Sequence, residues 1–74
     1  MTVSIRALIR RINRRLAHKY EILRKTRSHR WWSDLGDYYV LDWNLNFVVA
    51  SHVDPETLGR ELGALKSWET VVVE

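Results

Sequence analysis

Apolar residues recur at steps of three and four positions along the first third of the chain, and this spacing limits the fold more than any other feature. The series is Ile5, Leu8, Ile9, Ile12, Leu16, Tyr20 and Leu23. At about 100° per residue, these side chains fall on one helical face that is roughly 120° wide. The spacing predicts a helix from about Ile5 to Arg27, with Ser4 or Thr2 as its N-cap. Lys19 falls inside the apolar face, where it must extend to solvent or mark a bend.

The hydrophobic period changes after this segment. Residues 28–37 contain Gly36 and flanking aspartates, which are typical of a connector. The stretches Tyr38–Asp42 and Phe47–His52 are rich in aromatic and β-branched residues, and four residues with two turn-forming asparagines separate them. This pattern predicts a β-hairpin.

A second helix has a clear start signal. Asp54 is suited to the N-cap, Pro55 to the first helical position, and Glu56 adds negative charge in the first turn. Glycines at positions 59 and 63 weaken this helix but permit close approach of the hairpin or of another chain. After the helix, residues 71–73 are all valine and can form a further strand.

The predicted fold is one α+β domain, residues 1–74, with a long N-terminal helix and a shorter C-terminal helix packed on a small antiparallel sheet. The order is α-β-β-α, with a possible third strand at the C-terminus. The expected core is Ile5, Leu8, Ile9, Ile12, Leu16, Tyr20, Leu23, Val40, Phe47, Val49, Leu58, Leu62 and Leu65. A chain of 74 residues without cysteine is marginally stable and has no disulfides. Oligomerisation, such as a homodimer, is the natural supplement.

Charge is divided between the two parts of the chain. Residues 1–30 contain ten Lys and Arg and one acid, a formal charge of +9, whereas residues 31–74 contain two basic residues and eight acids, a charge of −6. A surface of one sign predicts a polyanionic partner, and arginine makes bidentate contacts with phosphate. An unpaired base can stack on tryptophan, but we expect one of Trp31 and Trp32 to lie in the core and anchor the helix to the sheet. The candidate contact residues for nucleic acid are Arg6, Arg10, Arg11, Arg14, Arg15, Arg24, Lys25, Arg27, Arg30 and Trp31.

Other interpretations of the charges stay open. The basic side chains can simply form a solvated helix face, or the two oppositely charged parts can pair between the protomers of a homodimer. An acidic surface can instead imitate or block a nucleic-acid path on a partner protein. That surface would comprise Asp34, Asp37, Asp42, Glu56 and Glu61.

The sequence offers no chemistry typical of an enzyme. It has no recognisable nucleophile and base pair, metal-ligand set or phosphate loop, so we expect no catalytic residue, no metal and no cofactor. It has neither a signal-peptide pattern nor an apolar run of about 18 residues. We therefore expect a cytoplasmic protein without a membrane partner.

The predicted hairpin resembles that of RelE/ParE-type toxins. The resemblance rests on Gly36–Val40, Asn46–Val49 and His52, about seventeen residues in all, and it implies a ribosome-dependent ribonuclease. Tyr39 and Val53 stand where that family has arginine, so the residues that carry its chemistry are not matched. Ribonuclease activity is therefore a minor alternative.

As a whole, the chain is similar to small accessory proteins of bacterial plasmids, integrated elements and phages, through the hairpin and the segment Leu58–Gly63. This resemblance implies host defence complexes as one class of partner, and an anti-CRISPR protein is the concrete form of the inhibitor alternative. The leading hypothesis is a non-enzymatic protein that engages nucleic acid or a ribonucleoprotein through the Arg-rich face of its first helix.

Overall fold

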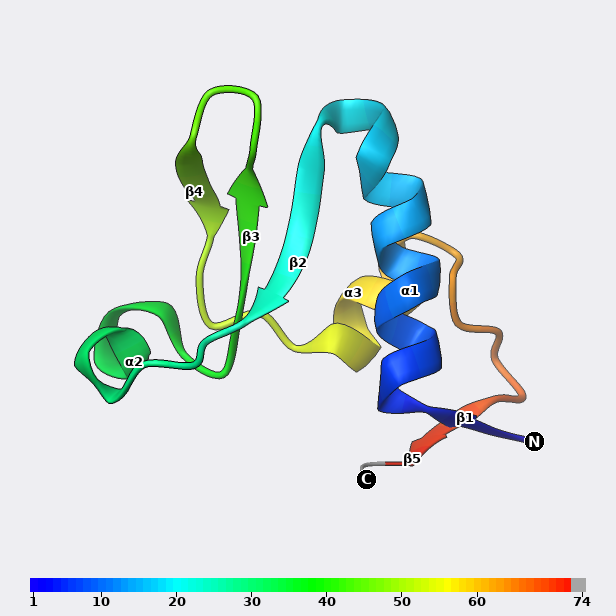
Figure 1. Cartoon of the computed structure of the whole chain (residues 1–74). Helices are drawn as coiled ribbons and strands as arrows, with labels where there is room; N and C mark the ends of the chain where they lie inside the picture. Colours follow the sequence, from blue (N-terminus) through cyan, green and yellow to red (C-terminus); the bar gives the residue numbers. More distant parts are fainter. Residues whose placement is uncertain (73–74) are drawn as a thin grey trace.

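The structure, a computed structural model, describes residues 1–72 and has the α+β architecture that the sequence predicts (Figure 1). Its elements are β1 (Thr2–Ser4), α1 (Ile5–Leu16), the 3-10 helix η1 (Ala17–Lys19), β2 (Glu21–Lys25), α2 (His29–Leu35), β3 (Tyr38–Asp42), β4 (Phe47–Ala50), α3 (Pro55–Glu61) and β5 (Thr70–Val72). A three-stranded antiparallel sheet has the order β2-β3-β4, and β1 pairs separately with β5. The predicted strand residue Val73 lies outside the described residues.

The first helix is the longest, but its predicted end at Arg27 is wrong. Ser4 caps α1 by accepting a hydrogen bond from the Ala7 N–H at 3.1 Å, as predicted, and the helix ends at Leu16. The chain then reverses at Tyr20, which has a φ of 61° in the left-handed region. A helix of 23 residues would be about 34 Å long, and its last turns would lack a packing partner in a protein this small.

Residues 21–25 therefore form a strand, although Tyr20 and Leu23 fit the helical period of the preceding apolar residues. β2 pairs with β3 in antiparallel register from Glu21 opposite Asp42 to Lys25 opposite Tyr38. β2 thus adds a third strand to the hairpin of β3 and β4. An isolated two-stranded hairpin would be only marginally stable. The reversal is held by the hairpin, because the Trp43 N–H donates to the Tyr20 carbonyl at 3.0 Å and the two rings meet edge to face at 5.3 Å.

The predicted hairpin is confirmed, with β4 ending at Ala50 rather than His52. β3 and β4 pair in antiparallel register, from Val40 opposite Ala50 to Asp42 opposite Phe47, with one irregularity after Val40. Asn46 closes the loop with a φ of 59°, a conformation that asparagine tolerates well.

α1 lies beside β2 (Figure 1), and Asn13 joins the two elements. Its side-chain oxygen accepts a hydrogen bond from the Leu23 N–H at 2.7 Å, and its nitrogen donates to the Leu23 carbonyl at 3.3 Å. One amide thus satisfies both backbone groups of a residue on the outer edge of β2. The contact fixes the position of β2 relative to the helix.

The predicted connector 28–37 contains a short helix, α2, so that prediction is wrong for most of its length. Ser28 caps the helix by accepting from the Arg30 N–H at 3.3 Å. Gly36 ends it with a φ of 74°, and a Cβ there would lie 2.9 Å from the His52 Cα. Glycine is therefore required both for the turn and for the passage of the chain beside His52.

α3 begins as predicted. Asp54 accepts a hydrogen bond from the Glu56 N–H at 3.3 Å, and Pro55 occupies the first turn. The absence of a side chain at Gly59 permits a close approach, as predicted, but the element that approaches α3 there is α1 and not the hairpin. A Cβ at Gly59 would lie 2.8 Å from Cδ1 of Leu8.

The C-terminal strand β5 does not extend the hairpin. It pairs in parallel with β1, an element that the sequence analysis missed, so that Val3 lies opposite Val71. The first and last strands of the described chain consequently lie side by side (Figure 1).

The core lies between α1, α3 and the inner face of β2 and β3. Its buried apolar residues are Val3, Leu8, Ile12, Leu16, Leu23, Val40, Ala64 and Leu65. The predicted core residues Ile5, Ile9, Leu58 and Leu62 are half-buried against it.

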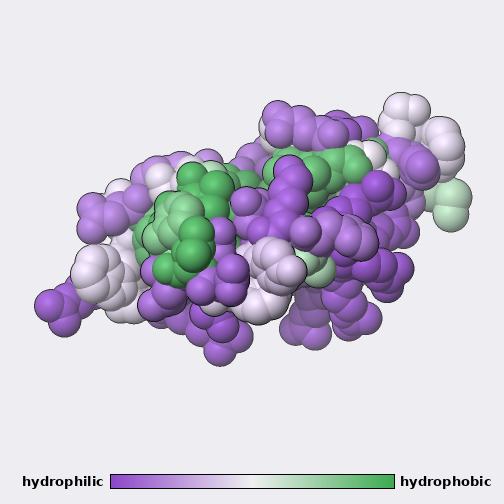
Figure 2. Space-filling model, turned by 90° about the horizontal axis from the view of Figure 1, so that it is seen from above, coloured by the Kyte–Doolittle hydropathy of each residue, from purple (hydrophilic) through white to green (hydrophobic). Residues whose placement is uncertain are grey.

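Three core predictions are wrong, those for Tyr20, Phe47 and Val49. Phe47 and Val49 belong to β4, an edge strand whose four residues are all exposed. Tyr20 packs outside the core, against Trp43 of the hairpin loop. Figure 2 shows hydrophobic surface over the hairpin.

Candidate nucleic-acid interface

The chain reversal at Tyr20 gathers basic residues that the sequence analysis placed far apart. In a continuous helix, Arg24 and Lys25 would lie beyond the C-terminal end of α1. In the structure β2 returns along α1, with Leu23 bonded to Asn13. Arg24 and Lys25 line the same groove as Ile9, in the N-terminal half of the helix. The fold thus brings two separate stretches of positive charge together.

The basic face of α1 consists of exposed arginines. Arg6, Arg10, Arg14 and Arg15 are all exposed to solvent. At about 100° per residue, Arg6 and Arg10 lie within roughly 20° and 60° of Asn13, whose side chain contacts β2. They therefore project on the side of the helix where Arg24 and Lys25 lie, whereas Arg15 projects toward Gly63 on the opposite side.

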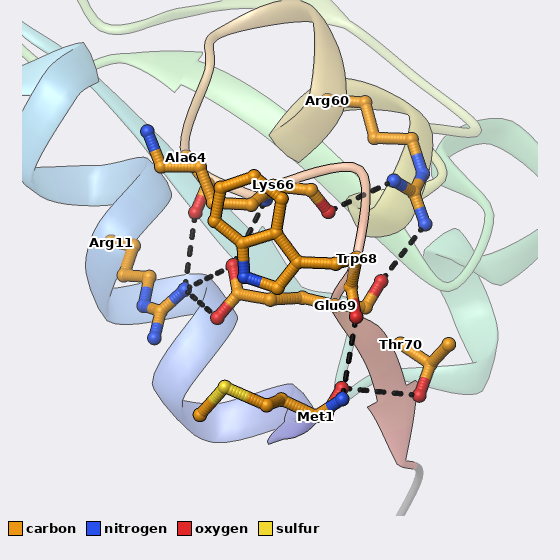
Figure 3. Close-up of polar contacts among 8 residues, drawn as sticks. All are labelled: Met1, Arg11, Arg60, Ala64, Lys66, Trp68, Glu69 and Thr70. Atoms are coloured by element: carbon orange, nitrogen blue, oxygen red, sulfur yellow. Dashed lines mark hydrogen bonds and ion pairs between the residues drawn. The ribbon is translucent and has the colours of Figure 1, made fainter.

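Arg11 is the one predicted contact residue of α1 that the fold itself engages. Its guanidinium lies 3.0 and 3.1 Å from the two carboxylate oxygens of Glu69 and donates to the Ala64 carbonyl at 3.3 Å. From α3, Arg60 donates to the carbonyls of Lys66 and Glu69, both at 3.2 Å. Figure 3 shows the two arginines on either side of this C-terminal segment. Both guanidinium groups therefore hold the chain between α3 and β5.

Glu69 is a buried carboxylate, and its environment favours the ionised form. A hydrogen bond from the Lys66 N–H at 2.9 Å lowers the pKa of Glu69 most, and the hydrogen bond and charge of Arg11 lower it further. Burial acts in the opposite direction, but the net result is a pKa below the ordinary glutamate value. The Glu69 carboxylate therefore stabilises the fold and neutralises Arg11, which leaves that arginine less able to bind an external anion.

Both tryptophans of α2 are exposed, so the expectation that one of them lies in the core is wrong, and the two differ in their partners. Trp32 donates its Nε1–H to Asp37 at 2.7 Å. Trp31 makes no side-chain hydrogen bond within residues 1–72, is 51 % exposed, and has the Arg30 guanidinium 5.6 Å from its ring centroid. That distance is within the range of a cation–π interaction. Trp31 thus presents an aromatic ring and a positive charge together.

A groove of about 660 Å³ lies between α2, β2 and β3, with Ile9 of α1 at one side. Its apolar and aromatic lining includes Ile22, Leu35, Tyr39 and Trp31, and its basic residues are Arg24, Lys25 and Arg27. The sequence analysis named the basic residues and Trp31 but missed Ile22, Leu35 and Tyr39. The side-by-side placement of Ile22 and Arg24 on one face of a strand would have revealed part of the groove.

A second groove of about 630 Å³ lies between α1 and the C-terminal segment. It contains Arg14, Arg15, Lys66 and Trp68, which is 64 % exposed, together with the Arg11–Glu69 pair. Sequence analysis missed Lys66 and Trp68, because their proximity to α1 depends on the path of residues 62–69. The predicted contact residues are therefore divided between two sides of the molecule.

The residues of the alternative acidic surface are distributed over α2, β3 and α3, and three of them have internal partners. Asp37 accepts from Trp32, Asp42 accepts from the N–H groups of Asn44 and Leu45 in the hairpin loop, and Glu56 lies 3.5 Å from Arg60. Asp34 and Glu61 are exposed. Asp37 and Glu56 line one pocket together with Asp54 and Lys25, whereas Asp34, Asp42 and Glu61 lie outside the lining of that pocket.

Residues 1–72 contain neither a metal-ligand cluster nor a membrane-spanning helix. Within residues 1–72, no group of three or more His, Cys, Asp or Glu side chains is placed to hold a metal ion. No helix in this part of the chain combines the length and the apolar character needed to cross a bilayer.

No family model, no curated protein and no solved structure matches this chain.

Proposed function

We propose that this protein is a non-enzymatic binding module that engages nucleic acid, free or within a ribonucleoprotein, through phosphate contacts from α1, β2 and α2. Contacts to phosphate carry little sequence information, so binding is expected to depend on salt more than on base sequence. A cytoplasmic location and an origin in a bacterial mobile element belong to the same hypothesis and come from the sequence alone.

One observation carries the proposal. Within residues 1–72, the ion pairs join Arg11 to Glu69 and Arg60 to Glu56. The other nine Lys and Arg of residues 1–30 take part in neither pair, and the return of β2 places some of them beside α1. These side chains are all positively charged and repel each other. A polyanion that bridges them relieves that repulsion and releases counterions.

The test is fluorescence anisotropy with labelled single-stranded and duplex DNA and RNA at several salt concentrations. We expect affinity to fall as salt rises. In the double variant Arg6→Ala, Arg10→Ala, the magnitude of the slope of log affinity against log salt should decrease by roughly 1.4 to 1.8, since each phosphate contact contributes about 0.7 to 0.9. Both arginines are exposed, so the variant should fold, which circular dichroism can verify.

A charge-matched control separates local contact from total charge. Ser51→Asp with Ser67→Asp changes the net charge by the same amount at two exposed positions outside α1 and β2. It should leave the salt slope nearly unchanged. Equal slopes for both double variants, or no salt-sensitive binding to any of the four probes, would overturn the proposal.

The competing function is inhibition of a protein partner through acidic residues, as in an anti-CRISPR protein. Charge reversal at Asp34 and Glu61 is the suitable test, because these two exposed acids have no hydrogen-bond or ion-pair partner in the described chain. Loss of partner inhibition with intact nucleic-acid binding would favour that alternative. Under our proposal, this reversal leaves nucleic-acid binding intact and strengthens it slightly, because it makes the net charge more positive.

A further inference from the structure

The groove between α2, β2 and β3 has the features of a site for unpaired bases. Apolar and aromatic side chains line it, and three basic residues stand beside them. Aromatic rings bind bases of any identity by stacking, while cations hold the phosphates between them. We propose that this groove binds single-stranded nucleic acid, with a base stacked on Trp31 and phosphates held by Arg24, Lys25 and Arg27. The inference rests on the proposed function and specifies its preferred ligand.

The surroundings of Trp31 distinguish it from the neighbouring tryptophan. The Trp32 indole is tied to Asp37 by a hydrogen bond, and this contact explains its orientation within the fold. Both rings lie half in solvent, although burying a large ring ordinarily stabilises a protein. Trp31 differs from Trp32 because its side chain has no hydrogen-bond partner in residues 1–72. α2 has no buried residue, so packing of this helix does not require a tryptophan at position 31. Contact with a ligand accounts for an exposed ring in a groove that also holds Tyr39.

The electrostatics of the groove favour a phosphate chain. Arg24, Lys25 and Arg27 come from β2 and the residues that follow it, and Arg30 stands over the Trp31 ring. None of these four residues takes part in an ion pair of the described chain. Among the residues that the structure describes, the groove lining contains no acid. A phosphate that approaches Trp31 therefore meets positive charge on several sides.

The groove also discriminates between single and double strands. In a duplex, the faces of the bases are stacked on their neighbours, and only phosphates are available to the basic residues. A single strand can place one base against Trp31 at little cost. The same cations therefore bind both forms, but the ring adds affinity for the single strand alone.

The second groove serves as the internal comparison. It too contains an exposed tryptophan, Trp68, beside Arg14, Arg15 and Lys66. However, it also contains the ionised Glu69, which neutralises Arg11 and repels phosphate. Its lining has less apolar character around the ring, so we assign base stacking to Trp31 and not to Trp68.

The experiment measures anisotropy with labelled dT15 and with the same strand in a dT15·dA15 duplex. Trp31→Ala should weaken dT15 binding by roughly 5- to 150-fold, the range expected for loss of one base–aromatic stack. Duplex affinity should stay within about twofold, because its phosphate contacts remain. Trp31→Phe should retain most of the affinity for dT15, since phenylalanine keeps a ring, and Trp68→Ala should bind as the wild type does.

The outcomes separate this inference from the proposed function. If wild-type protein binds neither these probes nor their RNA counterparts, the proposed function fails. If it binds both probes and Trp31→Ala reduces neither affinity, or both equally, the stacking site is wrong while phosphate binding stands. A larger loss in Trp68→Ala than in Trp31→Ala also overturns the assignment.

Photocrosslinking gives an independent check that needs no substitution. A dT15 strand with one 5-iodouracil should crosslink to Trp31 or Tyr39, as mapped by mass spectrometry. Crosslinks confined to Trp43 or Trp68 would contradict the proposed site.

Discussion

The region around α1 and α3 differs sharply from the outer region formed by α2 and β4. In the first, Leu8 and Ile12 are 0 % exposed, and Val3, Ala64 and Leu65 pack beside them. In the second, α2 has no buried residue and every residue of β4 is exposed. Apolar side chains are present in both regions, but only the first uses them to form the core. Substitutions in the outer region can therefore report on binding with little effect on folding.

The largest expected effect is in the inner region. Leu8→Ala removes a fully buried side chain that contacts the backbone of α3 at Gly59, and such truncations cost about 2–5 kcal/mol. That is a large part of the roughly 4–11 kcal/mol expected for 74 residues. Urea denaturation followed by circular dichroism should show the loss.

Leu45→Ala makes the same chemical change in the hairpin loop, where the leucine is exposed. It should alter the free energy of unfolding by no more than about 0.5 kcal/mol. Similar losses at positions 8 and 45 would contradict the division into two regions.

A smaller effect concerns acid stability of the inner region. Because the fold lowers the pKa of Glu69, its carboxylate contributes stability that is complete above the ordinary glutamate pKa of about 4.3. That contribution is lost as pH falls through the lower pKa of the folded state. Glu69→Gln should therefore destabilise the protein at neutral pH and flatten the decline of stability on acidification.

Glu61→Gln is the matched control, since Glu61 is exposed on α3 and takes part in no ion pair of the described chain. Urea denaturation at a series of pH values should show a wild-type decline for this variant. If instead Glu61→Gln flattened the decline as much as Glu69→Gln, the contacts of Glu69 with the Lys66 N–H and with Arg11 would not be the source of the acid sensitivity.

The same two regions show how far local sequence signals predict the fold. The start of α3 was predicted from Asp54 and Pro55, and the hairpin from its turn residues, because caps and turns depend on neighbouring positions. The end of α1 was predicted wrongly, since Tyr20 and Leu23 fit a helical period although pairing with β3 makes residues 21–25 a strand. Lys19, which lies inside the predicted apolar face, was the local sign of the bend.

The candidate site was predicted in part for a related reason. Exposure of Arg6 and Arg10 follows from their place on α1, whereas the engagement of Arg11 depends on Glu69, 58 residues away. The meeting of Arg24 with Tyr39 and Leu35 in one groove likewise depends on the return of β2. Contacts between residues so far apart in the sequence cannot be inferred from the spacing of residues within one helix or strand.

The smallest expected effect tests whether β4 is exposed in solution. Val49→Thr keeps a β-branched side chain on an edge strand and replaces a methyl group by a hydroxyl that water can reach, because Val49 is 45 % exposed. It should change the free energy of unfolding by less than about 0.5 kcal/mol.

Val40→Thr, on the adjacent strand, buries its hydroxyl and should cost about 1–3 kcal/mol. Urea denaturation of both variants at two protein concentrations gives the comparison. Val49→Thr could instead lose as much stability as Val40→Thr, with a loss that grows with protein concentration. That result would mean that a second copy covers the free edge of β4. The outer region would then contribute to stability through association.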